Sequence, residues 1–294
     1  MEVAMPQRSP RRPGDMTRIG DLLPAPDMDA RPADGACQDC GVATEPVWLP
    51  TAVSGNWHLP SLCPACAEAR RQERESRERR EREQQRLQDR IRRAGLASPY
   101  RASRRFETFR QVAGTEQALA AAQAFAVAMG QEPRPHKGLL LVGSHQQEPN
   151  GCGKTHLALA ILHQVFEANP ARAVLFVEFA DYLGALKRSF SNDRAEGNTD
   201  WVRGAMFSVD LLVLDDIGAA ANSRGGWDTE EMCRLLNHRI ECGLPIVATV
   251  DLGPEEMRER LGGRVVSRLY EACEMVPIEA GDYRKRVLRG GVDG

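Results

Sequence analysis

Short runs of apolar residues recur between residues 138 and 278, and segments with the spacing of amphipathic helices separate them. The runs are Gly138 to Val142, Ala173 to Phe179, Asp210 to Leu214, Pro245 to Val250 and Met275 to Ile278. Thr155 to Glu167 and Glu230 to Glu241 carry apolar residues at helical spacing. Because apolar runs that alternate with helices are typical of an α/β fold, the pattern predicts a parallel sheet flanked by helices.

A long charged segment precedes this region, from Glu68 to Arg93, and consists almost wholly of Arg, Glu and Gln. Opposite charges stand four residues apart, as in Glu73 and Arg77, Glu75 and Arg79, and Glu78 and Arg82. The segment is predicted to be a solvated helix, and with Leu87 and Ile91 as its only large apolar residues it has no coiled-coil seam. Residues 70 to 93 hold eleven arginines and six acidic residues. Contact with a phosphate backbone therefore stays open, although the interleaved glutamates favour a spacer with internal ion pairs.

The chain has 294 residues and a net charge of −2, which allow a sizeable core and a small accessory module but indicate no class of partner. Residues 1–33 are rich in Pro, Arg, Asp and Ala and are predicted to be a disordered tail. The rest is predicted to divide into a small module at 34–69, a charged helical linker at 70–95 and a large α/β domain at 96–294.

The composition also bears on the compartment. No apolar run is long enough to span a bilayer, and no signal-peptide pattern follows the basic N-terminus. Four of the eight cysteines form two Cys-x-x-Cys pairs, and the other four are scattered. Because this usage is typical of a reducing compartment, the sequence predicts a cytoplasmic protein without a membrane partner.

The small module holds both cysteine pairs, separated by twenty-two residues. The predicted metal ligands are Cys37, Cys40, Cys63 and Cys66. Each pair can present two thiolates on a tight turn, which Gly41 would permit, and four thiolates suit a tetrahedral Zn²⁺ ion. The module has too few apolar residues for a core of its own, so zinc is the predicted staple. Four unliganded thiols or a redox pair are the alternative, and His58 is a less favoured ligand.

A glycine-rich turn lies between the first apolar run and the helical segment that follows it. The turn, Gly151-Cys-Gly-Lys-Thr155, has the strand, turn and helix context of a Walker A loop. In such a loop backbone N–H groups converge on phosphate oxygens, the lysine neutralises the β- and γ-phosphates, and the threonine hydroxyl binds Mg²⁺. The predicted ATP contacts are Asn150, Gly151, Cys152, Gly153, Lys154, Thr155 and, at the start of the helix, His156.

The spacing of this loop departs from the usual Walker A pattern. Glu148 stands where the pattern has its first glycine, and Gly143 lies too far upstream, as if about five residues were inserted. Because a carboxylate beside a triphosphate would be repulsive, residues 144–148 are expected to bulge outward and to leave Asn150 to Thr155 as the cradle.

A second motif, Val209-Asp-Leu-Leu-Val-Leu-Asp215-Asp216, closes a later apolar run. A buried strand that ends in two carboxylates has the form of a Walker B motif. Asp215 is predicted to hold Mg²⁺ through water, and Asp216 to orient the attacking water. Either motif alone would also suit an unrelated glycine turn or strand end, but both in this order predict binding of ATP and Mg²⁺.

From about Gly95 to Arg286 the chain resembles the DnaC/IstB-like family of AAA+ ATPases, which contains replicative-helicase loaders and transposition helper ATPases. The residues that carry the resemblance are Arg105-Phe-Glu-Thr-Phe109, Gly151 to Ala158, Asp210 to Gly218, Gly243-Leu-Pro245, Leu261 to Leu269 and Asp282-Tyr-Arg284. The resemblance implies an AAA+ P-loop fold with ATPase activity for residues 96–294, preceded by the zinc-binding module and the charged helix.

The resemblance also implies roles for residues outside the two motifs. Arg268 looks like the arginine finger, which in the family reaches the γ-phosphate bound by a neighbouring subunit and so implies self-association. Arg284 looks like the sensor-2 arginine. Thr249-Val-Asp251 stands at the sensor-1 position, among the nucleotide contacts, where the family usually has a Thr/Ser-Asn pair. The extra carboxylate of Asp251 would affect the rate of hydrolysis rather than the binding of ATP.

The leading functional hypothesis is an ATP-dependent helicase loader in DNA replication, with a replicative helicase and single-stranded DNA as partners. By analogy with loaders of the family, the zinc module would dock on the helicase. Two alternatives stay open. One is a transposition helper ATPase that coats duplex DNA, and the other is an ATP-binding switch that has lost hydrolysis through Asp251 and the altered loop.

Overall fold

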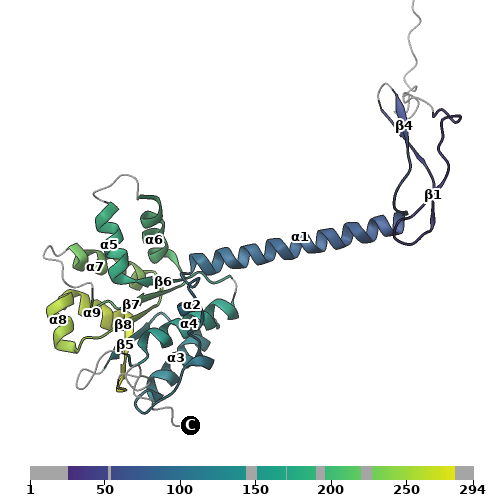
Figure 1. Cartoon of the computed structure of the whole chain (residues 1–294). Coiled ribbons are helices and arrows are strands. Elements are labelled where there is room, and N and C mark those ends of the chain that lie inside the picture. Colours follow the sequence, from purple (N-terminus) through teal and green to yellow (C-terminus); the bar gives the residue numbers. More distant parts are fainter. Residues whose placement is uncertain are drawn as a thin grey trace, which may run out of the picture. The chain divides into compact units, whose positions relative to one another are not determined.

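The computed structural model describes residues 26–51, 54–143, 151–169, 171–189, 196–219 and 227–281 (Figure 1). The chain divides into two compact units, Met1–Gln85 and Arg86–Gly294, and the boundary falls inside one long helix, α1 (Pro64–Arg93). Each unit has its own tertiary contacts.

The larger unit is built on a five-stranded sheet whose strands all run parallel. The strands are β5 (Gly138–Gly143), β6 (Val174–Glu178), β7 (Leu211–Asp215), β8 (Ile246–Val250) and β9 (Cys273–Ile278). These confirm the predicted strands, with small differences at their ends. Their order is β6-β7-β8-β5-β9, so β7, β8 and β5 form the centre. Because carboxyl ends of parallel strands meet at one edge, the glycine turn after β5 and the acidic end of β7 come to the same place.

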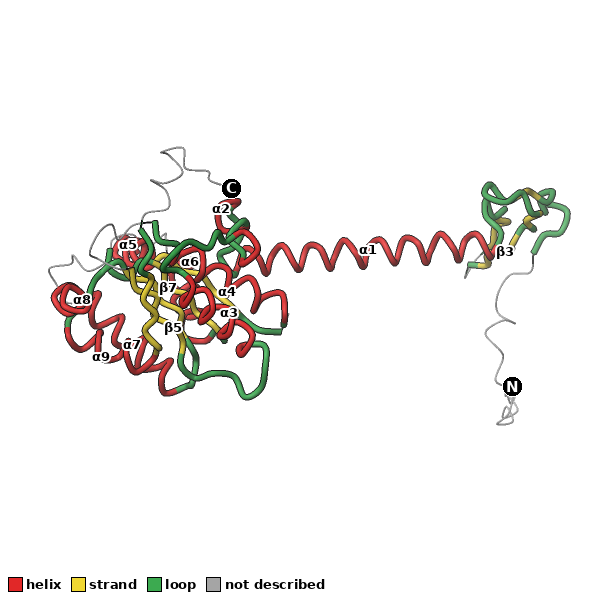
Figure 2. The backbone as a smooth tube through the Cα atoms, turned by 90° about the horizontal axis from the view of Figure 1, so that it is seen from below, coloured by secondary structure: helices red, strands yellow, loops and turns green. Residues whose placement is uncertain are grey.

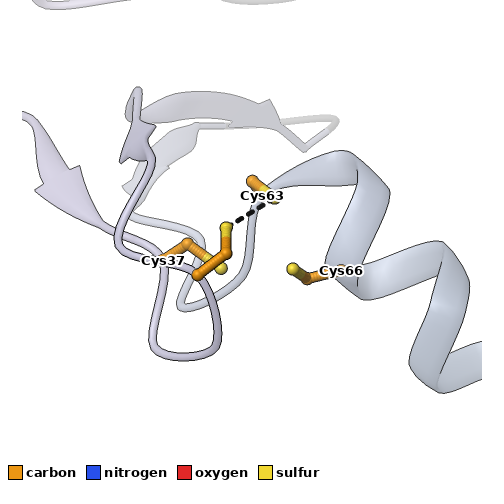
Figure 3. A group of neighbouring side chains, drawn as sticks. Cys37, Cys63 and Cys66 are labelled. Atoms are coloured by element: carbon orange, nitrogen blue, oxygen red, sulfur yellow. Dashed lines mark hydrogen bonds between the residues drawn. The ribbon is translucent and has the colours of Figure 1, made fainter.

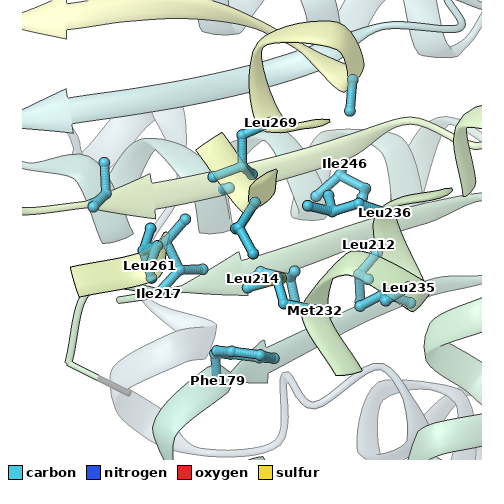
Figure 4. Packing of buried hydrophobic residues seen from close by; sticks show 14 of the residues in the cluster. Phe179, Leu212, Leu214, Ile217, Met232, Leu235, Leu236, Ile246, Leu261 and Leu269 are labelled. Atoms are coloured by element: carbon cyan, nitrogen blue, oxygen red, sulfur yellow. The ribbon is translucent and has the colours of Figure 1, made fainter. Parts of the chain in front are cut away.

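Helices cover both faces of this sheet (Figure 2). One face carries α3 (Glu116–Met129) and α4 (Lys154–Ala168). The other carries α5 (Phe179–Ser189), α6 (Glu196–Ser208), α7 (Trp227–Glu241), α8 (Pro254–Leu261) and α9 (Gly263–Ala272). Leu211 and Val213 of β7 pack with the first group. Leu212 and Leu214 pack with the second group, as Figure 4 shows. Since successive strand residues point to opposite faces, the apolar runs of the sequence supply both cores.

The segment that connects α1 to α3 is fixed along α4 by two histidines. It contains α2 (Pro99–Ala102) and the short 3₁₀ helix η2 (Phe106–Thr108). The Nε2 atoms of His156 and His163 lie 2.8 and 3.0 Å from the carbonyl oxygens of Arg105 and Arg101, respectively. Burial lowers the pKa of both imidazoles, which favours their neutral form. The two contacts, two helical turns apart, hold the connecting segment against the helix that begins at the glycine turn.

The smaller unit contains two antiparallel strand pairs. These are β1 (Gly35–Ala36) with β2 (Ala43–Thr44), and β3 (Val47–Pro50) with β4 (Gly55–His58). The rings of Trp48 and Trp57 pack against each other across the second pair in an edge-to-face arrangement, with centroids 5.5 Å apart. Nε1 of Trp57 donates to the carbonyl oxygen of Asp27 at 2.8 Å, so residue 27 contacts the module. Residues 1–25 of the predicted tail lie outside the described residues.

Helix α1 is the predicted charged helix, and none of its residues is buried. Of the opposite charges noted four residues apart in the sequence, Glu78 and Arg82 form an ion pair of 3.1 Å. Arg77 and Arg79 pair instead with the glutamates four residues ahead, Glu81 and Glu83, at 2.8 and 3.0 Å. Solvent screens exposed pairs of this kind, so each contributes little and the helix depends on many weak interactions. In the part of the chain that the structure describes, no helix has both the length and the apolar content needed to cross a membrane.

Candidate functional site

The glycine turn joins β5 to α4, and its described part begins at Gly151. Gly151 and Gly153 have φ values of 85° and 97°, in the left-handed region that favours glycine. At Gly153 a Cβ atom would also lie 2.9 Å from Cε2 of Phe109. Both positions therefore need glycine. The turn places the N-terminus of α4, with its backbone N–H groups and partial positive charge, where an anion would be bound.

Lys154 is the first residue of α4, and its side chain is 7% exposed. Its Nζ forms an ion pair with the carboxylate of Asp251 and lies 3.2 Å from Sγ of Cys152. Burial by itself lowers the pKa of Lys154, but the Cys152 sulfur and the Asp251 carboxylate outweigh it, so the pKa is raised. Lys154 therefore stays charged in a buried position, as a residue that neutralises phosphate must.

Asp215, the last residue of β7, is buried and accepts hydrogen bonds from two hydroxyls. Thr155 donates from the first turn of α4, with Oγ1 2.9 Å from Oδ1 and 3.1 Å from Oδ2. Thr249 donates from the neighbouring strand β8, at 2.6 Å to Oδ1. Burial raises the pKa of Asp215, and the two hydroxyls oppose this shift. Because P-loop proteins hold Mg²⁺ with a loop hydroxyl and a strand-end aspartate, this contact fits the ion.

Asp216 follows at the exposed edge of the sheet, with a φ of 52° that is uncommon for a residue other than glycine. Its backbone N–H donates to Oγ1 of Thr249 at 2.9 Å, so Thr249 fixes both acidic residues of β7. Partial burial and the negative charge of Asp251 raise the pKa of the Asp216 carboxyl. The two carboxylates of Asp216 and Asp251 are therefore neighbours beside Lys154.

A cavity of about 340 Å³ adjoins the glycine turn on the side of the connecting segment. Its walls include Arg104, Thr108, Phe109, Thr115, Gly153 and His156, and among its described lining residues none is acidic. The ring of Phe109 stands edge-on to the imidazole of His156, with centroids 5.2 Å apart. The size and the aromatic wall suit a nucleobase with its ribose. The sequence predicted His156 and the glycines here but missed the rest, for which the only signal was the Arg105-to-Phe109 motif of the resemblance.

In the described part of the chain, the structure does not place three of the predicted nucleotide-site residues in this cluster. Arg268 lies on α9, on the opposite face of the sheet from α4, and forms an ion pair with Glu271. Asn150 and Arg284 lie outside the described residues, as does the segment 144–148 that was expected to bulge outward.

The four cysteines predicted to bind zinc converge in the smaller unit (Figure 3). Their Sγ atoms all lie within 4.8 Å of one another, and those of Cys40 and Cys63 are 3.7 Å apart. A tetrahedral Zn²⁺ ion with Zn–S bonds of about 2.3 Å separates its sulfurs by about 3.8 Å, so this cluster fits the ion. Among the described residues the cluster consists of these four thiols and does not include His58.

The turn around the first cysteine pair is also suited to a metal. Gly41 has a φ of 73°, and its N–H donates to the carbonyl oxygen of Cys37 at 2.9 Å, which closes the tight turn that the sequence predicted. Backbone N–H groups, first that of Cys63, lower the pKa of Cys37 to about 6. The thiolate, which is the form that binds metal, is thereby favoured at neutral pH.

Comparison with known sequences places this site in context. Residues 101–275 match the family described as the bacterial DnaA ATPase domain. The replicative helicase loader DnaC of Escherichia coli is 30% identical over 138 residues, which are 47% of this chain and 54% of that protein. The chromosomal replication initiator protein DnaA of Lactococcus lactis is 30% identical over 182 residues, 62% of this chain and 37% of that protein. The chain thus spans about half the length, or less, of these relatives.

Solved structures share the fold of the larger unit. The crystal structure of the DnaC helicase loader aligns with a TM-score of 0.51 and 25% identity, over 62% of this chain and 100% of that one. The crystal structure of DnaI aligns with a TM-score of 0.50 and 22% identity, over 62% of this chain and 95% of that one. The second likeness concerns the fold alone.

Proposed function

Because the chain belongs to the family of the bacterial DnaA ATPase domain, we propose that it is an ATP-hydrolysing AAA+ protein that loads a replicative helicase during DNA replication. Family membership confirms the predicted AAA+ P-loop fold, and the likeness to DnaC confirms the DnaC-like resemblance. The observation that carries the proposal is the convergence of Lys154, Thr155 and Asp215 at one edge of the sheet.

Each of these residues has a defined task in the proposed site. When bound, ATP would supply the phosphoryl group and Mg²⁺ would neutralise part of the negative charge of its phosphates. Lys154 neutralises the β- and γ-phosphates and gives up part of its contact with Asp251 to do so. Thr155 and Asp215 hold the metal, Asp215 through water, and Asp216 orients the water that attacks. The cavity beside Phe109 holds the nucleoside.

A binding-only switch is the second candidate, and the position of Asp251 favours it. The carboxylate lies beside Lys154 and raises the pKa of Asp216, which is the residue proposed to orient water. An extra negative charge at this point would slow hydrolysis without preventing ATP from binding. Turnover measured together with ATP affinity separates the two candidates.

The proposed partners are a replicative helicase and single-stranded DNA. The likeness to the DnaC helicase loader supports the helicase, and a loader has to deliver its helicase to an unpaired strand. By analogy with loaders of the family, we assign helicase docking to the zinc module, which exposes Val47, Leu49 and Leu59.

Self-association is proposed through Arg268, which would reach the γ-phosphate site of a neighbouring protomer. Its side chain is 42% exposed and its partner Glu271 is 49% exposed, so the pair can exchange for a stronger anion at little cost. A nucleotide site without a second cation near the γ-phosphate would be incomplete in a single protomer.

The test is helicase loading with purified proteins. The full chain is mixed with the replicative helicase of its own host, ATP and a circular single strand, and helicase retained on the circle is counted after gel filtration. Parent protein should increase retention only with ATP, and Lys154→Ala should not. Retention that is independent of this protein, in a preparation that binds ATP, would overturn the loader assignment and leave the nucleotide site standing.

A further inference from the structure

A second cavity, of about 260 Å³, lies in the larger unit and shares no lining residue with the cavity at the glycine turn. It is enclosed by the end of α1, the end of α4, the start of β6 and helix α6. None of the nucleotide-site residues described above takes part in it. The cavity therefore needs an explanation of its own.

The interior of this cavity is apolar. Phe166, Leu175 and Val209 are buried in its walls, with 7%, 3% and 8% of their surfaces exposed. Trp201 also lines it but keeps 46% of its surface exposed. The exposed part of this indole is apolar surface in contact with water, so a ligand that covered it would gain free energy from its burial.

Cationic groups border this apolar interior. Arg90, Arg93 and Arg172 line the cavity, and among its described lining residues none is acidic. The guanidinium of Arg90 lies over the ring of Phe166, with Cζ 4.4 Å from the centroid. Two buried nitrogens, Nη2 of Arg90 and Nε of Arg172, have no hydrogen-bond partner among the described residues.

The guanidinium groups that line the cavity indicate what it would accept, because a guanidinium offers only donors. The two orphaned nitrogens are themselves buried and offer a ligand no direct contact. Arg172 is held in place by ion pairs with Glu132 and Asp210, which take up part of its charge. An anion in the cavity would therefore be attracted mainly by Arg90 and Arg93 of α1.

We propose that this cavity binds a free amphipathic anion, an aromatic group or short acyl chain with one carboxylate or sulfonate. The apolar body would cover Trp201 and Phe166, and the anionic group would accept from Arg90 and Arg93. Size favours this class over a nucleotide, since about 260 Å³ is below the roughly 300–1,000 Å³ of sites for larger ligands. The bound anion would fasten the last turns of α1 to α6.

The probe is 8-anilinonaphthalene-1-sulfonate, an aromatic sulfonate, titrated into the full chain and followed by its emission and by energy transfer from tryptophan. Arg93→Gln should weaken binding about tenfold, the effect of one charge-assisted hydrogen bond. Trp201→Phe should reduce the energy transfer. The matched control is Arg92→Gln, because Arg92 is the neighbouring arginine, pairs with Asp89 at 3.4 Å and does not line the cavity.

A pair of competitors tests the required charge. In competition with the dye, the dissociation constant of octanoate should be at least about tenfold lower than that of octanol, which has the same chain length without the charge. The peptide Gly-Gly-Phe also carries one carboxylate, but its ammonium and peptide groups would lose their water in an apolar cavity, so it should compete less well than octanoate. Equal displacement by octanol, tighter displacement by the peptide, or unchanged dye affinity in folded Arg93→Gln would each overturn the proposal. Arg90→Gln serves as a second variant, and circular dichroism checks that each variant folds.

Discussion

The hydroxyl of Thr155 donates a hydrogen bond of 2.9 Å to Asp215, although the two residues are 60 positions apart in the chain. Strand order explains the contact, because β5 and β7 both border β8. The turn after β5 and the end of β7 therefore flank the same strand, and Thr249 of β8 bonds to Asp215 as well. The topology of the sheet, rather than either motif alone, assembles the proposed metal site.

Thr249→Val tests this arrangement. Valine keeps the shape of the side chain but removes both the bond to Asp215 and the acceptor for the Asp216 N–H. We expect the affinity for Mg²⁺-ATP to fall about tenfold and the free energy of unfolding to fall by ~1–3 kcal/mol. Titration with a fluorescent ATP analogue and urea unfolding measure the two effects. Thr249→Ser keeps the hydroxyl and should stay close to the parent; if the two variants bind ATP alike, Thr249 does not position the acidic pair.

Phe109→Ala separates the nucleoside side of the site from the phosphate cradle. Loss of the ring beside His156 should weaken ATP about tenfold, within the range for one aromatic contact to a base. Inorganic tripolyphosphate has no base or ribose, so its affinity should not change. Lys154→Ala, as the control, should weaken both ligands. If Phe109→Ala weakens the binding of ATP and of tripolyphosphate equally, the ring only shapes the turn at Gly153, next to which it lies.

His163 predicts a pH dependence of stability. Burial lowers the pKa of its imidazole below the ordinary value of about 6.5, so below that pH the unfolded chain takes up a proton that the folded chain does not. The contribution of His163 is therefore complete above pH 6.5 and declines as the pH falls towards the folded pKa. The decline is at most about 1.4 kcal/mol per pH unit. His163→Gln should flatten the curve of unfolding free energy against pH between 7 and 5.5, and parallel curves for the two proteins would contradict this prediction.

Removal of the metal should affect the smaller unit alone. A strong chelator, or replacement of Cys37 and Cys63 by Ser, should abolish one bound zinc per chain and unfold the module, because structural zinc supplies much of the folding free energy of so small a core. Elemental analysis under reducing conditions counts the zinc. Tryptophan emission reports the module through Trp48 and Trp57. Cys242→Ser, at an exposed cysteine of the larger unit, is the control and should keep its zinc.

The sheet could be predicted because each strand is buried on both faces and so appears as an uninterrupted apolar run. Residues such as Leu211 and Leu212 pack into different cores, yet both must be apolar. The cysteine cluster could be predicted for a similar reason, since two Cys-x-x-Cys pairs have the chemistry and spacing of a metal site, and among the described residues these four thiols converge. In both cases the residue type by itself restricts the structure.

Where a side chain has several suitable partners, the sequence does not predict which of them it contacts. On α1 Arg77 has Glu73 four residues before it and Glu81 four residues after it, and it pairs with Glu81. The ion pair between Lys154 and Asp251 was also not predictable, because it depends on β5 lying next to β8. Phe109 belongs to the Arg105-to-Phe109 motif, but the motif does not tell that its ring forms a cavity wall, because many side chains can provide an apolar surface.

The last prediction concerns coupling between protomers through Arg268. Lys154 and Mg²⁺ cover only part of the charge that develops on the γ-phosphate, and an arginine finger is worth roughly 10³-fold or more in rate in comparable sites. Arg268→Ala should therefore keep its ATP affinity but lose turnover, and turnover of the parent should rise more than linearly with protein concentration.

Mixing two inactive variants shows whether this arginine acts between chains. In a mixture with Asp216→Asn, the arginine of the second variant can enter the intact site of Arg268→Ala, so part of the activity should return. Glu271→Gln is the matched control, because it removes the partner of Arg268 within its own chain and leaves the arginine free to reach a neighbour. If the mixture stays inactive while cross-linking shows that the two variants assemble together, Arg268 does not complete a neighbouring site. Slow turnover in both parent and mixture would instead implicate Asp251, whose carboxylate lies beside Lys154 in every protomer.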